Sequence, residues 1–267
     1  MTPFTAWTPD AAAARIAVPG EHDDKYTRGV LGVVTGSTMY PGAAVLGVEA
    51  ALRAGIGMAR YLGEAGDLVL QRRPEVVTAD GRVQAWLLGS GMDHVDRQLE
   101  PLLKALGQNV PVVLDGGALD LHDRATGPVV ITPHYGELAR VTGASRDAIA
   151  ADPGMWAARA ADELGVTVLL KGHTTYAVGP GVSLSVTGAP TWLATAGAGD
   201  ALAGILGALV ATHAAEIAAD PGELARLAAT AAVIHGLAAT RASAGGPLTI
   251  LGLAHAIPAT IAGLLAG

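Results

Sequence analysis

The chain of 267 residues is long enough to bury a large hydrophobic core without disulfide bonds or a structural metal. Its composition, 51% hydrophobic and 15% charged, excludes an intrinsically disordered chain. The formal net charge of −7, with scattered Lys and Arg residues, excludes a basic surface for nucleic acid.

The N-terminal segment, MTPFTAWTPD, lacks the basic start and the apolar stretch of a signal peptide. The most apolar run, 201–211, is interrupted by Gly204 and Gly207 and is shorter than the roughly 18 apolar residues that span a bilayer. The chain also has no cysteine, which fits a reducing compartment. We therefore expect a cytoplasmic protein.

Short apolar runs rich in β-branched residues alternate with longer Ala/Leu-rich segments over the first two thirds of the chain. The runs that predict buried strands are Val30–Val34, Ala85–Leu88, Val112–Leu114, Val129–Ile131 and 166–170. The segments that predict helices are 43–54, 97–106 and 155–164. Because strands separated by helices pair in parallel through right-handed crossovers, this order predicts an α/β protein with a mostly parallel sheet and helices on both faces.

The pattern after Gly199 is helical only. Helical spacing continues over 200–212, 221–240 and 254–265. Asp220 is suited to cap the second of these helices, with Pro221 in its first turn. Since no linker-like segment and no fixed-period repeat divides the chain, we expect one domain over residues 1–267.

Two glycine-rich turns follow predicted strands in the first half of the chain. In a parallel sheet, ligands bind where strands end, because backbone N–H groups and helix N-termini converge there. The segment GVVTGSTMYPGAA, 32–44, is as typical of a ligand-binding turn as of a tight connection between a strand and a helix. The segment LLGSGMD, 87–93, is more typical of a plain turn.

Three ionisable residues follow the next strands. Asp115 comes directly after a buried strand, where an acid either faces a ligand crevice or caps the next turn. His134, in ITPHYGEL, titrates near neutral pH and so can bind substrate or transfer a proton, although a histidine at a helix start is more often structural. Glu137 is typical of favourable charge on a first helical turn.

The segment VLLKGHTTYAV leads a strand into a cation, a glycine and two hydroxyl groups. The residues concerned are Lys171, Gly172, His173, Thr174 and Thr175. Such a group suits the phosphate or ribose of a nucleotide. A solvated lysine at the end of a strand explains the pattern equally well.

The segment TAGAGDALAG, 195–204, carries the clearest chemical signal. Gly197, Ala198 and Gly199 leave backbone N–H groups open at the start of a long helix, which makes an anion site. Asp200 is out of place beside an anion unless it accepts a proton from the hydroxyl that attacks the phosphate. A helix cap is the competing explanation, and the chain has no Walker A motif.

Five segments in this order resemble the ADP-dependent NAD(P)H-hydrate dehydratase family of the ribokinase-like superfamily. They are KYTRGVLGVVTGSTMYPGAA, ITPHYGELARVTG, VLLKGHTTYAV, PTWLATAGAGDALAGILGAL and AAVIHGLAA. G-x-G-D alone indicates only the superfamily, whereas its combination with TPH-x-GE and KG-x-TT is specific. The resemblance extends from about Lys25 to the C-terminus and implies a ribokinase-like three-layer sandwich.

The resemblance also implies repair of the S epimer of hydrated NADH or NADPH. ADP phosphorylates the hydroxyl of the hydrate, phosphate then leaves, and NAD(P)H, AMP and phosphate are the products. The residues that match substrate contacts of the family are Ala43, Gly91, His134 and Asp200. Those that match its nucleotide site are Lys171, Gly172, His173, Thr174, Thr175 and Gly199. Asp200 would be the catalytic base, with Mg²⁺ bridging the phosphates and no residue assigned as a metal ligand.

Two segments depart from the family pattern. The turn GSGMD stands where G-P-G-x-G is usual, which makes Gly91 the weakest of the matches. LDGGAL has Gly117 where many relatives carry a second aspartate, which leaves the role of Asp115 open. Many relatives are fused to an epimerase, an activity that we do not expect in this chain, and the resemblance implies a homotetramer.

Two other functions stay open at this point. One is an ATP-dependent kinase of the same superfamily that acts on a vitamin precursor or a sugar. The other is a nucleotide sensor without catalysis, against which the presence of Asp200 argues. A kinase accumulates a phosphorylated product, whereas the dehydratase releases phosphate and restores the absorbance of reduced nicotinamide.

Overall fold

The computed structural model describes residues 3–95 and 97–267, and in this part of the chain nine strands form one sheet. The strands are β1 (Thr5–Ala6), β2 (Val30–Val34), β3 (Met58–Tyr61), β4 (Ala85–Leu88), β5 (Val112–Leu114), β6 (Val129–Ile131), β7 (Thr167–Leu170), β8 (Thr175–Gly179) and β9 (Val182–Val186). Their order across the sheet is β1-β9-β8-β7-β6-β5-β4-β2-β3. All neighbours run parallel except β8, which is antiparallel to both β7 and β9. The predicted, mostly parallel sheet is confirmed.

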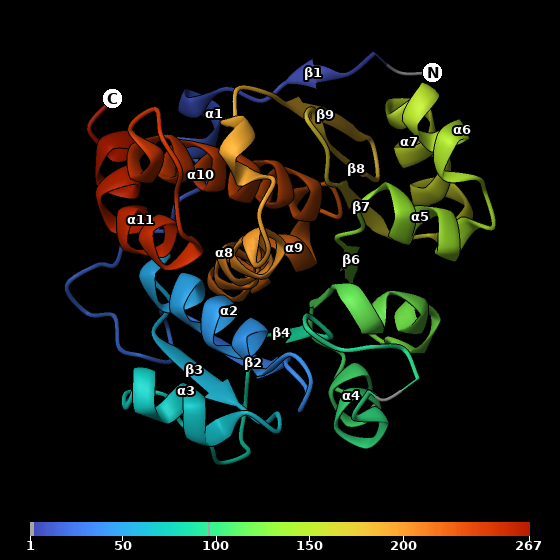
Figure 1. The fold of residues 1–267 in the computed structure, drawn as a ribbon. Helices are drawn as coiled ribbons and strands as arrows, with labels where there is room; N and C mark the ends of the chain where they lie inside the picture. The colour runs from blue at the N-terminus through green and yellow to red at the C-terminus, as the bar shows by residue number, and fades with distance from the viewer. Residues whose placement is uncertain (1–2, 96) are drawn as a thin grey trace.

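Helices cover both faces of this sheet (Figure 1). One face carries α2 (Pro41–Arg53), α3 (Gly66–Arg72), α8 (Ala198–Thr212), α9 (Ala214–Ala219), α10 (Glu223–Ser243) and α11 (Ile250–Leu265). The other carries α4 (Leu99–Leu106), the 3₁₀ segment η1 (Gly116–Arg124), α5 (Tyr135–Thr142), α6 (Arg146–Ala151) and α7 (Pro153–Leu164). The short elements α1 (Pro9–Ala13) and η2 (Thr191–Leu193) complete the list of described helices. The three-layer sandwich is therefore confirmed.

Side chains alternate along each strand between the two hydrophobic cores. In β4, Leu87 packs under α8, whereas Trp86 and Leu88 face the opposite layer. Because both faces are covered, every residue of β4 is buried. This explains why the strands read as continuous apolar runs in the sequence.

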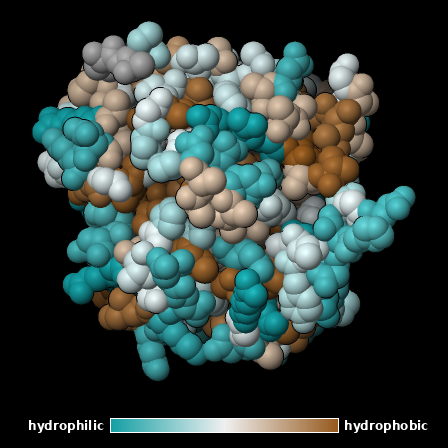
Figure 2. Space-filling view, turned by 180° about the vertical axis from the view of Figure 1, so that it is seen from behind, coloured by the Kyte–Doolittle hydropathy of each residue, from teal (hydrophilic) through white to brown (hydrophobic). Residues whose placement is uncertain are grey.

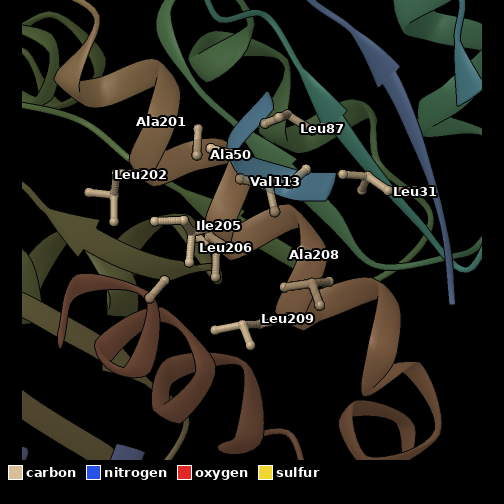
Figure 3. Close-up of a cluster of buried hydrophobic side chains, with 14 of the residues drawn as sticks. Leu31, Ala50, Leu87, Val113, Ala201, Leu202, Ile205, Leu206, Ala208 and Leu209 are labelled. Atoms are coloured by element: carbon tan, nitrogen blue, oxygen red, sulfur yellow. The ribbon is translucent and has the colours of Figure 1, made fainter. Parts of the chain in front are cut away.

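Helix α8 forms the centre of one core, and its residues 201–211 are all buried. Leu202, Ile205, Leu206 and Leu209 pack there among side chains from the sheet and from α2 (Figure 3). Gly204 allows α8 to approach α2 closely, because a Cβ at this position would overlap the carbonyl oxygen of Gly47. The crossing fixes the first turn of α8 against the first half of α2.

Several predicted element boundaries need correction. The helices predicted for 43–54, 97–106, 155–164 and 200–212 are α2, α4, α7 and α8, whose ends differ from the prediction by at most two residues. The strand predicted for 166–170 begins at Thr167, and the last helix begins at Ile250, where the Thr249 side chain caps it by accepting a hydrogen bond from the Gly252 amide. The prediction that Asp220 and Pro221 start a helix is wrong. Asp220 instead accepts a hydrogen bond from the Gly222 amide, and α10 begins at Glu223.

The sequence reading missed four strands, β1, β3, β8 and β9, because they are short or lie near an edge of the sheet and so carry weaker apolar patterns.

On the face opposite the view of Figure 1, hydrophobic residues form small groups among hydrophilic ones (Figure 2). Among the described residues, no helix has the length and apolar character needed to cross a membrane.

Candidate active site

The loops that follow β2, β4, β5, β6 and β7 meet at one edge of the sheet. The strand order reverses between β2 and β4, because β3 lies on the outer side of β2 and the later strands extend the other way. Such a switch point opens a crevice at the carboxyl ends of the strands. The loops after β2 and β4 are joined there by a hydrogen bond of 2.7 Å from the Gly36 amide to the Ser90 carbonyl.

Two of the residues predicted to bind substrate meet at this switch point. Ala43 lies in the first turn of α2, and Gly91 follows β4 with φ +65°. A Cβ on Gly91 would overlap the Cβ of Ala43, so only glycine allows the two turns to come this close. The structure thus brings together two turns that are 48 residues apart in the chain, as their numbers show.

Asp115 is held in a network of side-chain hydrogen bonds at the end of β5. Its Oδ1 accepts from the Thr132 hydroxyl at 2.7 Å and from the Lys171 ammonium at 2.8 Å. Its Oδ2 accepts from the Ser90 hydroxyl at 2.9 Å. Only 5% of Asp115 is exposed, and its side chain does not cap η1. Of the two explanations offered by the sequence, the cap is wrong, and the crevice stays a prediction.

The two departures from the family pattern lie against each other. A Cβ on Gly117 would lie 2.6 Å from the carbonyl oxygen of Met92, so the path of the GSGMD turn leaves no room for a side chain at Gly117. Ser90, in the same turn, supplies a hydroxyl to Asp115 that proline could not supply. The two changes are thus structurally linked.

His134 and Glu137 form the start of α5. The Nδ1 atom of His134 accepts hydrogen bonds from the amides of Gly136 and Glu137, while Oε2 of Glu137 accepts from the His134 amide at 2.8 Å. This reciprocal pair is a capping box. The His134 side chain is 61% exposed and lines the adjacent cavity, and its Nε2 lies 3.7 Å from Oε2 of Glu137.

Lys171 is buried at the end of β7. Its side chain is 19% exposed, and its Nζ lies 3.7 Å from Oε2 of Glu137 in addition to its bond with Asp115. The explanation of Lys171 as a solvated lysine is therefore wrong. Its ammonium lies 3.3 Å from the position of a Cβ on Gly199, which places the cation against the first turn of α8.

The first turn of α8 forms the expected cradle of backbone amides. Gly197 has φ +89° and precedes the helix without any side-chain cap. Asp200 is the third residue of α8, and among the described residues no hydrogen bond engages its carboxylate. The helix-cap explanation of Asp200 is not supported. The backbone of this turn packs against α2, since a Cβ on Gly47 would lie 3.5 Å from the carbonyl oxygen of Asp200.

Charge and burial set the protonation of these groups. Burial and the negative charges of Asp115 and Glu137 together raise the pKa of Asp200 to about 7, and Lys171 lowers it in part. Burial opposes the ionisation of Asp115, but Lys171 and the hydroxyl donors hold its pKa below the usual value. Burial likewise opposes the charge of Lys171, and Asp115 with Glu137 raises its pKa. A carboxylate that titrates near pH 7 is a suitable general base.

A cavity of about 760 Å³ opens beside this cradle. Its wall includes five of the predicted nucleotide residues, Lys171, Gly172, His173, Thr175 and Gly199. Thr174 belongs to the same turn without lining the cavity in the described structure. The volume is in the range of small-molecule sites.

Sequence reasoning missed three polar residues of this region. Ser90 and Thr132 support Asp115; Thr132 follows β6 directly and Ser90 follows β4 after one glycine, a signal that was available. His235, on α10, lines the cavity and is 7% exposed, and burial lowers its pKa to about 4. The imidazole of His235 is therefore uncharged at neutral pH. In the described part of the chain, no group of three or more His, Asp or Glu side chains is arranged to hold a metal ion.

Comparisons with known proteins agree with this geometry. A family model described as NAD(P)H-hydrate dehydratase matches residues 31–257. A bifunctional NAD(P)H-hydrate repair enzyme from Mycobacterium tuberculosis is 46% identical over 215 residues, which cover 75% of this chain and 44% of that protein. An ADP-dependent (S)-NAD(P)H-hydrate dehydratase from Xanthomonas campestris is 33% identical over 238 residues, which cover 79% of this chain and 82% of that protein. The matched segment thus spans less than half the length of the bifunctional relative.

The fold has close structural counterparts. The ADP/ATP-dependent NAD(P)H-hydrate dehydratase from Bacillus subtilis, co-crystallised with ATP and Mg²⁺, superposes with a TM-score of 0.87 and 24% identity over 99% of this chain and 100% of that one. A ribokinase-like superfamily protein from Enterococcus faecalis gives a TM-score of 0.86 at 22% identity, covering 100% of this chain and 98% of that one. These matches confirm the predicted ribokinase-like fold.

Proposed function

This chain belongs to the NAD(P)H-hydrate dehydratase family, and we propose that it restores NADH or NADPH from the S epimer of the hydrated cofactor, using ADP and releasing AMP and phosphate. One observation carries the proposal. Asp200, a carboxylate with a pKa of about 7 that caps no helix, lies in the first turn of α8 next to Gly199, which lines a cavity of about 760 Å³.

Asp200 acts first in the proposed reaction. Its carboxylate accepts the proton of the substrate hydroxyl while that oxygen attacks the β-phosphorus of ADP, and the bond from this phosphorus to the leaving AMP oxygen breaks. The amides at the start of α8 and the Lys171 ammonium stabilise the charge on the transferred group. The carbon–oxygen bond of the phosphate ester then breaks and phosphate leaves. The proton on the neighbouring carbon passes to water, and the electron pair of that C–H bond forms the double bond of the dihydronicotinamide.

The other predicted residues position the two substrates. Ala43, Gly91 and His134 are proposed to contact the hydrate, and the turn from Lys171 to Thr175, with Gly199, to contact ADP. Asp115, Glu137 and Asp200 carry more negative charge than Lys171 neutralises when all are ionised, so the site suits Mg²⁺ that arrives with the phosphates. Bound there, Mg²⁺ would neutralise part of the charge of the phosphates, and no residue is assigned as its ligand. The homotetramer, implied by the resemblance, and the cytoplasmic location, expected from the composition, stay predictions.

A single assay tests the proposal. The purified protein is incubated with hydrated NADH, Mg²⁺ and either ADP or ATP, and the recovery of reduced cofactor is followed by its absorbance together with the release of phosphate. We expect both signals with ADP. A phosphorylated compound that accumulates without recovery of NADH would instead indicate the ATP-dependent kinase, and binding without any product would indicate a nucleotide sensor.

A further inference from the structure

Asp115 is a buried, ionised side chain for which the proposed reaction has no direct use. The three donors around it come from three different strand ends, namely Ser90 after β4, Thr132 after β6 and Lys171 after β7. Ser90 and Thr132 are each 1% exposed. A carboxylate that is engaged on both oxygens by protein donors is poorly placed to bind a substrate.

The Lys171 ammonium is the one member of this network that reaches the reaction site. It lies against Gly199 in the cradle, and it lowers the pKa of Asp200, which burial and two nearby carboxylates raise. A lysine side chain has four rotatable bonds, so it loses considerable rotamer entropy when it is held in one conformation. Something must hold it, and the shortest contact of its Nζ is with Asp115 at 2.8 Å.

We propose that Asp115 is a positioning residue: with the Ser90 and Thr132 hydroxyl groups, it fixes the Lys171 ammonium in the amide cradle beside Asp200. The inference rests on the proposed function and extends it to three residues that touch neither substrate. Ser90 makes the arrangement particular to this chain, because the proline of the usual G-P-G-x-G turn has no side-chain donor.

The charged groups that face Asp200 make the inference testable by pH. They are Asp115 at the end of β5, Glu137 on α5 and Lys171 at the end of β7, while the contact with α2 is made by uncharged Gly47. Removing the negative charge of Asp115 favours ionisation of Asp200, whereas removing the positive charge of Lys171 disfavours it. The two changes therefore move the titration of Asp200 in opposite directions.

The experiment compares kcat as a function of pH for the wild type, Asp115→Asn and Lys171→Gln, with Asp123→Asn as the matched control. Asp123 lies on the neighbouring segment η1, and its side chain is 65% exposed. We expect Asp115→Asn to lower the plateau of kcat by about 10–100-fold, the effect of a misplaced reacting group. We also expect its acid limb to move to lower pH, that of Lys171→Gln to move to higher pH, and that of Asp123→Asn to stay in place.

A second readout keeps this inference separate from the proposed function. The carboxyl ¹³C resonance of Asp200 is titrated in the same proteins without substrate, so opposite shifts are measurable even if hydrated NADH is not converted. Ser90→Ala removes one donor to Asp115 and keeps the charge of Asp115, so we expect it to lower kcat less than Asp115→Asn does. It replaces Asp115→Asn in the experiment if that variant does not fold. Because Ser90→Ala keeps every charge, a positioning role predicts that Asp200 titrates at higher pH in this variant, as it does in Lys171→Gln. An unchanged titration and an unchanged kcat in Ser90→Ala would overturn the positioning role.

Discussion

Glu49 and Asp200 lie on two helices that pack together, α2 and α8, yet their surroundings differ in charge. Glu49 is fully buried, and its carboxylate contacts Arg53 at 2.7 Å, Arg72 at 3.5 Å and also Arg73. Although burial opposes ionisation, Arg73 and Arg53 lower the pKa of Glu49 to about 2. Asp200 instead shares a single lysine with two other carboxylates, and its pKa rises to about 7.

The comparison shows what decides the use of a buried carboxylate. Where cations are in excess, as around Glu49, the carboxylate is not protonated at neutral pH. Glu49 then connects α2 to α3 through Arg72 and to α11 through His255, whose Nε2 lies 3.6 Å from the carboxylate. Where anions are in excess, the proton is exchanged near pH 7, as proton transfer requires. The local charge balance therefore separates a structural acid from a reactive one.

The largest expected effect comes from removing the reactive acid. Asp200→Asn keeps the size of the side chain but cannot accept the hydroxyl proton, so we expect turnover to fall by about 10²–10⁴-fold, as for a lost general base. ADP affinity, measured by calorimetric titration, should stay close to that of the wild type, because the amide cradle and Lys171 are retained. Turnover equal to that of the wild type would remove Asp200 from the reaction.

The next effect comes from removing the structural acid. Glu49→Gln leaves the cations around it without their buried counter-charge, and breaking such a group costs about 3–5 kcal/mol of unfolding free energy. Urea unfolding at pH 7 measures the difference. Glu75→Gln is the matched control, since Glu75 contacts Arg73 at 3.4 Å but its side chain is 51% exposed. Equal midpoints for both variants would show that burial adds nothing to the Glu49 cluster.

Much of the fold could be predicted from the sequence, and of the two buried acids Asp200 could be singled out but Glu49 could not. The five predicted strands all exist, because burial on both faces makes each one a continuous apolar run. Asp200 could be singled out because a glycine-rich segment and a helix start lie next to it in the chain. Lys171 and Asp115 could be singled out, but not paired, because their contact depends on β6 lying between β5 and β7 in the sheet.

The Glu49 cluster could not be predicted for the same reason. Its partners Arg72 and Arg73 come from around the end of α3, and His255 from α11, so no spacing in the chain links them to Glu49. Arg53 is four residues away, a pattern equally typical of an exposed helical ion pair. Tertiary packing alone turns that ordinary pair into a buried cluster.

A smaller effect concerns stability as a function of pH. The pKa of Asp200 is about 7 in the folded protein against an ordinary value of 3.8, so between these pH values the folded state holds a proton that the unfolded state releases. The wild type therefore loses stability as pH rises through this window, and Asp200→Asn does not. Because Asp200 is only partly shielded from solvent, we expect the variant to be more stable by about 1–2 kcal/mol at pH 8. Thermal unfolding at pH 5 and pH 8 measures the difference, and a constant difference would contradict a raised pKa.

The smallest effect supplies a third case, an ion pair on the surface. Lys104 donates a hydrogen bond of 2.6 Å to Asp80, and their side chains are 67% and 49% exposed. This bond lowers the pKa of Asp80, yet water solvates both charges equally well when the pair is broken. We expect Lys104→Met to change the Tm little at low salt and not at all in about 1 M NaCl, where the screening length falls to about 3 Å. The loss in Glu49→Gln should persist at the same salt concentration, since buried charges are screened much less. If salt removed the stability changes of Lys104→Met and Glu49→Gln alike, the ion pairs of Glu49 would be screened like those on the surface. The difference in pKa between Glu49 and Asp200 would then rest on burial alone.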